Sequence, residues 1–367
     1  MPASIREISP ADAQAIREFN ARLAKAGVTF PFPVDSTELM QKEPGVDAPY
    51  QTAYVLSDGS AVRGGYILKE EQVFAAADSF AAGNYQLPLS EGIIDRKYAI
   101  VGVQLIRDAL ARQSRLYCLG MGSTTRPLPQ MLQRLGWNIS TVPFFFRIEN
   151  AGTFTREIHW LRQRRAVRYL LDLARYTGLL AAFTGLARLR RRILAGRAAA
   201  EVTVSEVATL PEEIDQLFPR LCGLYGLLCD RRAAAMRKKL PPHDPRFTRL
   251  TLRRSGVLAG WIVVSASQVR NHRQFGNMTL GCVVDGLAAP GDVDLLITEG
   301  CRRLDAANCD LVVTNQSHPV WIAAMRRQGF FRGPSNFVLA LSPQLAARAA
   351  AGPLHFTRAD GDGPINL

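Results

Sequence analysis

Two carboxylate side chains suited to proton transfer stand in apolar, strand-like segments. Glu91 lies within the apolar run 87–95, and Asp285 ends the matching run 278–285. Low contact with water raises the pKa of a carboxyl, which would make Glu91 a base that works near neutrality. Two structural interpretations stay open beside this one. Glu91 would point out of the sheet into water, and Asp285 would bond a turn at the end of its strand.

A polar segment follows a second apolar run and offers a further set of candidate groups. The run 309–315 ends at Asn315, and His318 comes shortly after it. An imidazole at this place could assist proton transfer. The structural alternative is that the segment caps a helix that starts near Pro319, because side-chain oxygens satisfy the free amides of a first turn.

A candidate anion site lies at residues 101–104. Val101, Gly102, Val103 and Gln104 follow an apolar strand and open a predicted helix. The first amides of a helix have no partner in the helix, and its dipole attracts anions, so a phosphate would be held there. The alternative is a plain helix start in which Gly102 permits close packing. A second helix start, near 291–296, carries Asp292 and Asp294, which would repel an anion and which we interpret as caps.

These segments belong to an internal repeat. Residues 54–148 and 249–341 both run in the order strand, turn, strand, helix, strand, helix and closing strand. Each half is expected to close on its own apolar strand, 142–148 in the first and 336–341 in the second. A helix between two apolar strands predicts parallel pairing, here of 92–95 beside 116–119 and of 283–285 beside 311–314. The expected product is a mostly antiparallel mixed sheet with a splayed parallel pair, formed twice.

This element order resembles the GNAT acyltransferase superfamily, present here in two copies. The similarity is most specific at residues 309–315, followed by a helix over 320–328 and the pair Gly329-Phe330. It implies an α/β fold of two GNAT-like domains, 1–150 and 201–345. A basic helical connector, 151–200, joins them, and a tail, 346–367, follows. The tandem arrangement is similar to Fem-type peptidyltransferases and to acyltransferases of bacterial surface-polysaccharide pathways.

The resemblance also implies a cofactor and roles for the candidate residues. Acetyl-CoA or another acyl-CoA would be the co-substrate, with its pyrophosphate at Val101–Gln104, where only Gly102 of the family's glycine pattern is kept. Asn315 would orient cofactor or substrate, and Glu91, Asp285 or His318 would handle the proton. The first domain is the better cofactor candidate. No metal is implied.

The connector carries most of the chain's positive charge. The net charge is +13, and residues 151–197 hold eleven arginines against one glutamate and one aspartate. Three interpretations stay open: helices packed on the domains with solvated arginines, an amphipathic hairpin on an anionic membrane surface, or a tRNA-binding surface. The uncharged, apolar middle of the segment favours lipid over RNA.

Several classes of protein are excluded by the sequence. The charged opening is not typical of a signal peptide, and no apolar run is long enough to span a bilayer. Six cysteines without close pairs predict a reducing, cytoplasmic setting. The membrane interpretation of the connector would add peripheral attachment at the inner membrane face. The histidines show no zinc spacing, and Asp360-Gly361-Asp362-Gly363 is too short for a calcium loop. This last segment is expected to be a mobile tail or a strap across the second domain.

The function predicted from these features is acyl transfer from acyl-CoA to an amine or hydroxyl. A sugar or lipid-linked glycan precursor is the leading acceptor class. A Fem-like ligase that uses aminoacyl-tRNA is the first alternative. The second is a non-catalytic binding or scaffold protein built from two degenerate domains.

Overall fold

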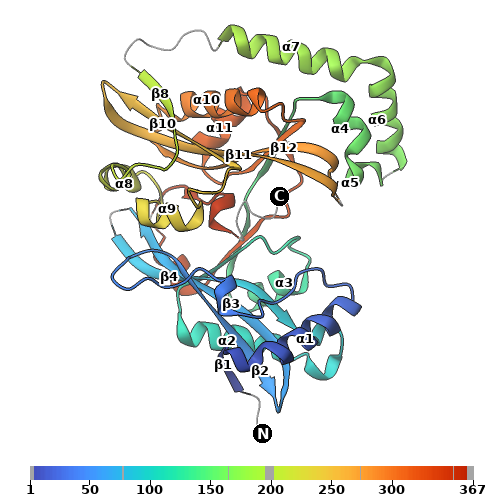
Figure 1. Cartoon of the computed structure of the whole chain (residues 1–367), viewed down its shortest axis with the longest axis vertical. Coiled ribbons are helices and arrows are strands. Elements are labelled where there is room, and N and C mark those ends of the chain that lie inside the picture. The colour runs from blue at the N-terminus through green and yellow to red at the C-terminus, as the bar shows by residue number, and fades with distance from the viewer. Residues whose placement is uncertain are drawn as a thin grey trace. The chain divides into compact units, whose positions relative to one another are not determined.

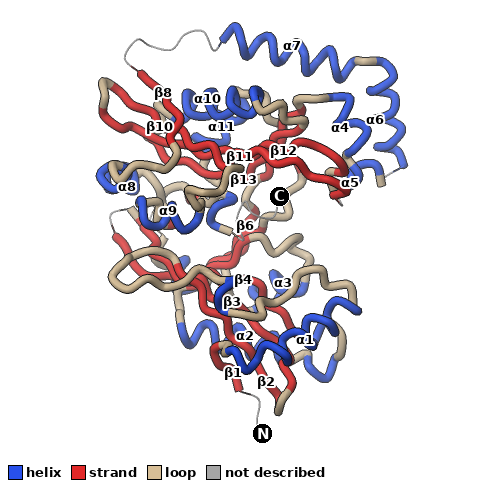
Figure 2. Tube along the Cα trace, viewed as in Figure 1, coloured by secondary structure: helices blue, strands red, loops and turns tan. Residues whose placement is uncertain are grey.

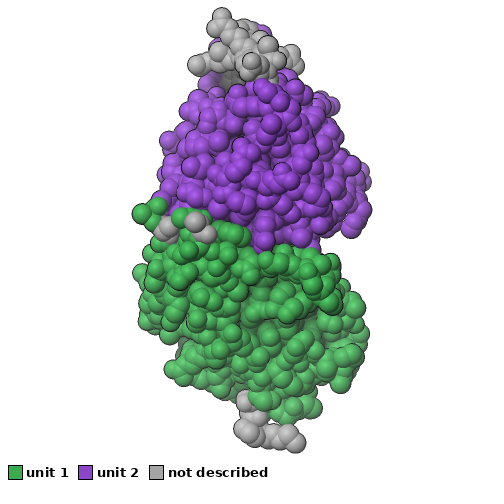
Figure 3. All heavy atoms as spheres, turned by 90° about the vertical axis from the view of Figure 1, so that its left-hand side faces the viewer, with its two compact units in different colours: residues 1–141, 336–351 green, residues 142–335, 352–367 purple. Residues whose placement is uncertain are grey.

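The structure is a computed structural model that describes residues 4–76, 78–163, 165–194, 202–272, 274–349 and 351–361. It divides into two compact units (Figures 1 and 3). Unit 1 comprises residues 1–141 and 336–351, and unit 2 comprises residues 142–335 and 352–367. None of the described helices is both long enough and apolar enough to cross a membrane.

Unit 1 is built on a mixed sheet with helices against it (Figure 2). Its strands, in spatial order, are β1 (Ser4–Glu7), β2 (Tyr50–Asp58), β3 (Ala61–Ala75), β4 (Asp78–Ser90), β5 (Leu116–Leu119), β15 (Val338–Leu341) and β6 (Asn138–Thr141). Only β4 and β5 pair in parallel within this order. Its α-helices are α1 (Ala13–Lys25), α2 (Val101–Arg112), α3 (Pro127–Arg134) and α12 (Pro343–Ala346).

In unit 1, the spacing of apolar side chains along each strand or helix explains which of its faces is buried. Successive side chains of β3 point to opposite faces of the sheet, so Tyr66 joins one apolar cluster and Ile67 the other. Helix α2 covers the first face with Leu105 and Ala109, which recur at the spacing of one helical turn. Helix α1 covers the second face. The expected mixed α/β sheet with flanking helices is confirmed.

Unit 2 repeats this architecture. Its seven strands, in spatial order, are β14 (Phe331–Gly333), β7 (Phe144–Ile148), β13 (Leu311–Asn315), β12 (Gly276–Ala288), β11 (Val257–His272), β10 (Phe247–Arg254) and β8 (Val202–Val207). Its α-helices are α4 (Ala151–Glu157), α5 (His159–Arg162), α6 (Arg165–Thr177), α7 (Leu179–Leu194), α8 (Ile214–Cys222), α9 (Ala233–Lys239), α10 (Val293–Ala306) and α11 (Pro319–Arg327). Short strands β9 (Leu227–Cys229) and β16 (Leu354–His355) pair in parallel. Trp321 of α11 and Leu296 of α10 are fully buried in the core cluster of this sheet.

The closing strands are exchanged between the halves of the sequence, which corrects the predicted domain boundaries. Strand β7, from the first half, pairs with β13 in unit 2. Strand β15, from the second half, lies between β5 and β6 in unit 1. Phe145 therefore joins the core of unit 2, and Ala340 joins the core of unit 1. An apolar closing strand satisfies either sheet equally well, so its composition does not reveal which sheet receives it.

Both parallel pairs are short and then separate. The pairing of β4 with β5 ends at Asn84 and Tyr117, and that of β12 with β13 ends at Cys282 and Val313. Strands β4 and β12 continue beyond these points, to Ser90 and Ala288. Beyond its last parallel pair, each sheet opens between the two diverging strands. We call this region the strand gap of that sheet.

In unit 1, the parallel pairing along β4 lies several residues before the predicted segment 92–95. Within the described chain, residues 92–95 pair with no strand. Strand β4 has already ended, and Glu91–Ile93 form a short 3-10 helix. A bulge at Leu87 and Pro88, opposite Tyr66, shifts the register before that point. Leu87 has a φ of 45°, and Pro88 has no N–H to give to a neighbouring strand. In unit 2 the paired residues, 280–282 with 311–313, also begin earlier than the predicted 283–285.

The connector and the part of the tail from residue 352 onward belong to unit 2, whereas residues 346–351 belong to unit 1. Residues 151–194 form α4 to α7, which confirms a helical connector over its described part. The C-terminal residues 354–361, which we call the C-terminal strap, are ordered and packed into unit 2. Phe356, Thr357 and Asp360 have no exposed surface, so the mobile-tail interpretation is wrong for this part. Asp362 and Gly363 lie outside the described residues.

Candidate functional site

The predicted cofactor residues form the first turn of α2 in unit 1. Ile100, the residue before the helix, accepts hydrogen bonds at 3.0 Å from the amides of both Val103 and Gln104. Val101 is buried and packs toward Gly64, whose backbone leaves no room for a β-carbon beside it. A β-carbon added to Gly102 would meet no atom within 4 Å. Gly64 therefore permits close packing, whereas the space beside Gly102 at the helix start is open.

The electrostatics of this helix start favour an anion. Helix α2 has 12 residues, so its dipole is well developed, and its apolar preceding residue cannot cap the first amides. Arg96 and Lys97 lie in the 3-10 turn that leads to the helix. The corresponding start of α10 in unit 2 is acidic. Asp292 and Asp294 are not side-chain caps there but pair with arginines, Asp292 with Arg254 at 2.8 Å and Asp294 with Arg327 at 2.7 Å.

Glu91 lies in unit 1, on the loop from β4 to α2. Its side chain is buried between those of two arginines. One carboxylate oxygen pairs with the Nε of Arg22, and the other accepts from Nη1 of Arg63 at 2.8 Å. The side chain is 4% exposed, so the interpretation that it points into water is wrong. The role of Glu91 as a base stays a prediction.

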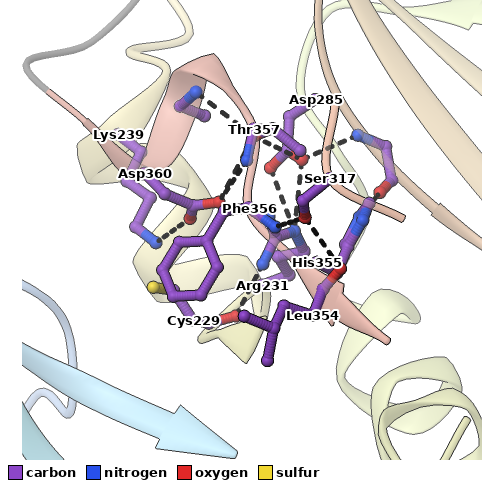
Figure 4. Close-up of polar contacts among 12 residues, drawn as sticks. Cys229, Arg231, Lys239, Asp285, Ser317, Leu354, His355, Phe356, Thr357 and Asp360 are labelled. Atoms are coloured by element: carbon purple, nitrogen blue, oxygen red, sulfur yellow. Dashed lines mark hydrogen bonds and ion pairs between the residues drawn. The ribbon is translucent and has the colours of Figure 1, made fainter. Parts of the chain in front are cut away.

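Asp285 lies in unit 2 within a fully buried ionic cluster (Figure 4). Its carboxylate is 3.2 Å from the Nε of Arg231, and Oδ1 accepts from the amide of Gly286 at 2.9 Å and from the hydroxyl of Thr357 at 3.1 Å. The second carboxylate of the cluster is Asp360, 2.7 Å from Nη2 of Arg231. Burial raises the pKa of Asp285, and the charge of Arg231 opposes that rise.

The opposite charges of the cluster are balanced. Lys239 supplies a second buried cation, with Nζ 3.5 Å from Asp360. Burial alone would lower the pKa of Arg231, but Asp285 and Asp360 raise it, so the guanidinium stays charged. Two cations thus face two carboxylates in a region without exposed surface. A buried set of this kind is stable only when each charge keeps its partner.

His318 caps α11 and is neutral. Its Nδ1 accepts from the amide of Val320 at 3.3 Å, so the ring proton is assigned to Nε2. Burial lowers the pKa of His318 to about 4. The ring lies edge-on to Tyr225 and to His355 of the C-terminal strap, with centroid separations of 4.8 and 5.9 Å. The helix that starts at Pro319 is therefore capped, but by the ring of His318 and not by an Asn or Ser side chain, which the sequence predicts.

Asn315 is held at the end of β13 by the C-terminal strap. Its Oδ1 accepts from Nη1 of Arg358 at 2.9 Å, and its amide nitrogen lies 3.5 Å from Ser335 Oγ. The side chain is buried. Asp285, Asn315 and His318 are thus brought together around the strap in unit 2, whereas Glu91 belongs to unit 1. Within unit 2 the structure thus brings three of the four predicted catalytic residues together, and their catalytic roles stay predictions.

The residues that sequence reasoning missed are those that complete the cluster in unit 2. Arg231, Lys239, Thr357 and Asp360 each bond to Asp285 or to one another, and His355 bonds to the carbonyl of Gly286 beside them. The segment Asp230-Arg231-Arg232 directly follows the apolar strand β9, and this charge beside a buried strand is the one available signal. Among the described residues, no group of three histidine, cysteine or acidic side chains is placed to hold a metal ion.

The connector helices expose an apolar surface. The exposed fractions run from 54% for Phe183 to 92% for Tyr176. The other exposed large apolar residues of this surface are Tyr169, Leu170, Leu173, Leu179, Leu186 and Leu189. Leu171 of α6 faces the protein. The side chains of Arg188 and Arg190 to Arg192, part of the predicted membrane or tRNA surface at 156–197, lie outside the described residues.

Comparison with known proteins shows the fold. No protein-family model matches the sequence. No curated protein matches it either. Among solved structures, a probable N-acyltransferase from Enterococcus faecalis V583 is similar over 94% of this chain and 74% of its own, with 9% identity and a TM-score of 0.54. A GCN5-related N-acetyltransferase from Anabaena variabilis matches over 92% and 72%, with 9% identity and a TM-score of 0.53.

A third similar structure carries a bound acyl-CoA. Saccharomyces cerevisiae N-myristoyltransferase with bound myristoyl-CoA is similar over 92% of this chain and 82% of its own, with 11% identity and a TM-score of 0.51. At these identities the likeness concerns the fold alone. Over nearly its whole length, the chain therefore has the fold of GNAT acyltransferases.

Proposed function

We propose that this protein is an acyltransferase that moves an acyl group from acyl-CoA to an amine or a hydroxyl. The observation that carries the proposal is the open, uncapped start of α2 beside the strand gap of a GNAT-fold sheet. In the transfer, the acceptor nitrogen or oxygen bonds to the thioester carbonyl carbon as the C–S bond breaks. The proton lost by the acceptor passes to a base, and coenzyme A leaves as its thiol or thiolate.

The donor site is proposed in unit 1. The free amides at Val101 and Gly102, with the dipole of α2, suit a pyrophosphate, and Arg96 and Lys97 add positive charge to the approach. Unit 2 offers acids at the matching helix start. The residues present therefore fit the anionic part of coenzyme A in unit 1 better than in unit 2.

Glu91 is the proposed base of this site. It lies on the loop that joins β4 to α2, in the same unit as the proposed donor site. Both of its carboxylate oxygens are engaged by Arg22 and Arg63, and an oxygen can take a proton from an acceptor only when it is free. We therefore expect acceptor binding to weaken one of these ion pairs. Asp285, Asn315 and His318 are assigned to the packing of the C-terminal strap instead.

A membrane-facing acceptor is proposed from the connector. The apolar surface of α6 and α7 is accompanied by exposed Arg165, Arg168 and Arg175 on α6. Exposed aromatic and leucine side chains beside arginines match the headgroup layer of an anionic membrane, where rings are immersed and guanidinium groups meet phosphates. A lipid-linked sugar precursor at the cytoplasmic face is the acceptor class that this surface supports.

Two measurements test the proposed function. Native mass spectrometry of the purified protein should show co-purified coenzyme A or acyl-CoA, and calorimetry should show binding of acetyl-CoA. A protein that binds neither of these compounds nor aminoacyl-tRNA would favour the alternative of a non-catalytic scaffold. Retention of aminoacyl-tRNA without acyl-CoA binding would replace the proposal with a Fem-like ligase.

A further inference from the structure

The C-terminal strap lies in the strand gap of unit 2 and bonds to both of its sides (Figure 4). On the β13 side, Gln316 bridges Thr357 in antiparallel fashion, and the amide of Ser317 donates to the carbonyl of Phe356 at 3.2 Å. The hydroxyl of Ser317 donates to the carbonyl of Leu354 and accepts from the amide of Phe356, both at 2.7 Å.

Hydrogen bonds to β12 hold the strap on the other side of the gap. The ring Nε2 of His355 lies 2.9 Å from the carbonyl of Gly286, and the Thr357 hydroxyl reaches Asp285. Gly286 is needed here, since a β-carbon on it would fall 2.4 Å from the ring of Trp321. Trp321 in turn stacks on His355, with ring centroids 5.6 Å apart. The strap is therefore fitted to this gap by side chains from β12, from α11 and from the segment after β13.

An ion pair at the end of the strap fixes it in place. Asp360 is fully buried and neutralises Arg231 and Lys239, which come from a different part of unit 2. If the strap left, these two buried cations would lose the carboxylate of Asp360. An uncompensated buried charge is strongly unfavourable, so the strap is bound as a permanent component rather than a movable lid.

We propose that the C-terminal strap permanently occupies the strand gap of unit 2, so that each chain binds a single acyl-CoA, in unit 1. The inference rests on the proposed function in one respect, namely that acyl-CoA binds along a strand gap. In unit 1 the matching helix start is open at Gly102. In unit 2 the gap holds residues 354–357, and the helix start holds Asp292 and Asp294.

The occupancy itself is tested without any ligand, by amide hydrogen exchange of the full-length protein. The amides of Phe356, Thr357 and Ala359 donate to side-chain acceptors, buried ones for Thr357 and Ala359, and should exchange as slowly as the core strand β11. Asp360→Asn, which removes the charge but keeps the shape, should speed exchange in the strap at least about tenfold while β11 stays protected. Unprotected strap amides in the wild-type protein would overturn the proposal.

The stoichiometry is tested by calorimetry with acetyl-CoA. The wild-type protein should bind one equivalent, as should a matched truncation after Gly361, which keeps every strap contact named here. A truncation after Pro353 should destabilise unit 2, because it removes a permanent component of its fold and leaves Arg231 and Lys239 without Asp360. Two equivalents in the wild type, or a protein cut after Pro353 that unfolds at the wild-type temperature, would contradict the proposal. No binding by the wild type, with a protected strap, would instead contradict the proposed function alone.

Discussion

The hydroxyl of Thr314 donates a hydrogen bond of 2.8 Å to the carbonyl oxygen of Val283, across the point where β13 and β12 separate. Unit 1 has the same relationship between Cys118 and Tyr85, where the thiol lies 3.1 Å from the carbonyl. In both sheets the donor is the first residue beyond the last parallel pair. A side chain thus satisfies the first carbonyl that the splayed ladder leaves without a backbone partner.

Removing this donor should destabilise unit 2. Thr314→Val keeps nearly the same shape but leaves the buried carbonyl of Val283 without its partner, at an expected cost of about 1–3 kcal/mol. Thr314→Ser retains the hydroxyl and should lose less. Urea unfolding followed by circular dichroism measures both variants. If Thr314→Val unfolds at the wild-type urea concentration, the hydrogen bond does not support the splayed pair.

The fold could be predicted from the sequence because the same element order is present twice. Residues 64–68 and 259–263 were matched by pattern, and both lie in long strands, β3 and β11, that pair with the splaying strand. The exchange of β7 and β15 could not be predicted. Their apolar residues fit either sheet, and the choice depends on how the chain connects the two units, which local pattern does not encode.

The exchange makes a prediction about isolated fragments. Residues 1–150, the first domain as the sequence suggests it, lack β15 and leave β5 and β6 without the strand between them. Unpaired edges of this kind promote aggregation, so the fragment should be insoluble or unfolded. Residues 1–141 joined by a flexible linker to 336–351 restore β15 and should fold. Size-exclusion chromatography and circular dichroism compare the two. A monomeric, folded 1–150 fragment would show that β15 is dispensable.

The candidate site was less accessible to sequence reasoning than the fold. The start of α2 follows from local pattern, and the structure places Val101–Gln104 there as expected. The charge partners of Glu91 and of Asp285 are far away in the chain, at Arg22 and at Arg231. No periodicity or spacing connects such residues, and so a buried ion pair looks in sequence like an isolated acid. The folded chain alone distinguishes a base from a charge partner.

The donor site predicts opposite outcomes for two matched glycines. Gly102→Glu should weaken acetyl-CoA binding at least about tenfold, roughly 1.4 kcal/mol, because it places a carboxylate before the amides proposed to bind the pyrophosphate. Gly291→Glu, before α10 in unit 2, should leave binding unchanged. Neither added side chain meets an atom within 4 Å at its β-carbon, so both variants should fold and melt like the wild type. Calorimetry measures the affinities. The reverse pattern would place the donor in unit 2.

His318 predicts a loss of stability in mild acid. Its pKa is about 4 in the folded protein against 6.5 for an ordinary histidine, so between these values the unfolded chain takes up a proton that the folded chain refuses. Stability should therefore fall as the pH falls from 6.5 to 4, by roughly 3 kcal/mol or less, and His318 should add no further loss below that.

The variant His318→Asn isolates this effect. Asparagine is a good helix cap and does not titrate, so it keeps the bond to Val320 and removes the proton site. The advantage of wild type over variant should shrink as the pH falls through this window. Denaturant unfolding at a series of pH values measures the difference. A difference that does not change with pH would mean that His318 titrates normally.

The apolar surface of the connector predicts binding to anionic membranes. Replacing Tyr169, Leu173 and Tyr176 with serine should reduce association with phosphatidylglycerol vesicles, because these exposed side chains would be the ones immersed in the headgroup layer. The contribution of the arginines should decrease with salt, since the Debye length falls from about 8 Å at physiological ionic strength to about 3 Å at 1 M. Phe30→Ser and Ile93→Ser, which change equally exposed apolar residues in unit 1, serve as controls. Vesicle flotation measures all variants, and equal flotation of the triple variant and the controls would assign the connector to packing within unit 2.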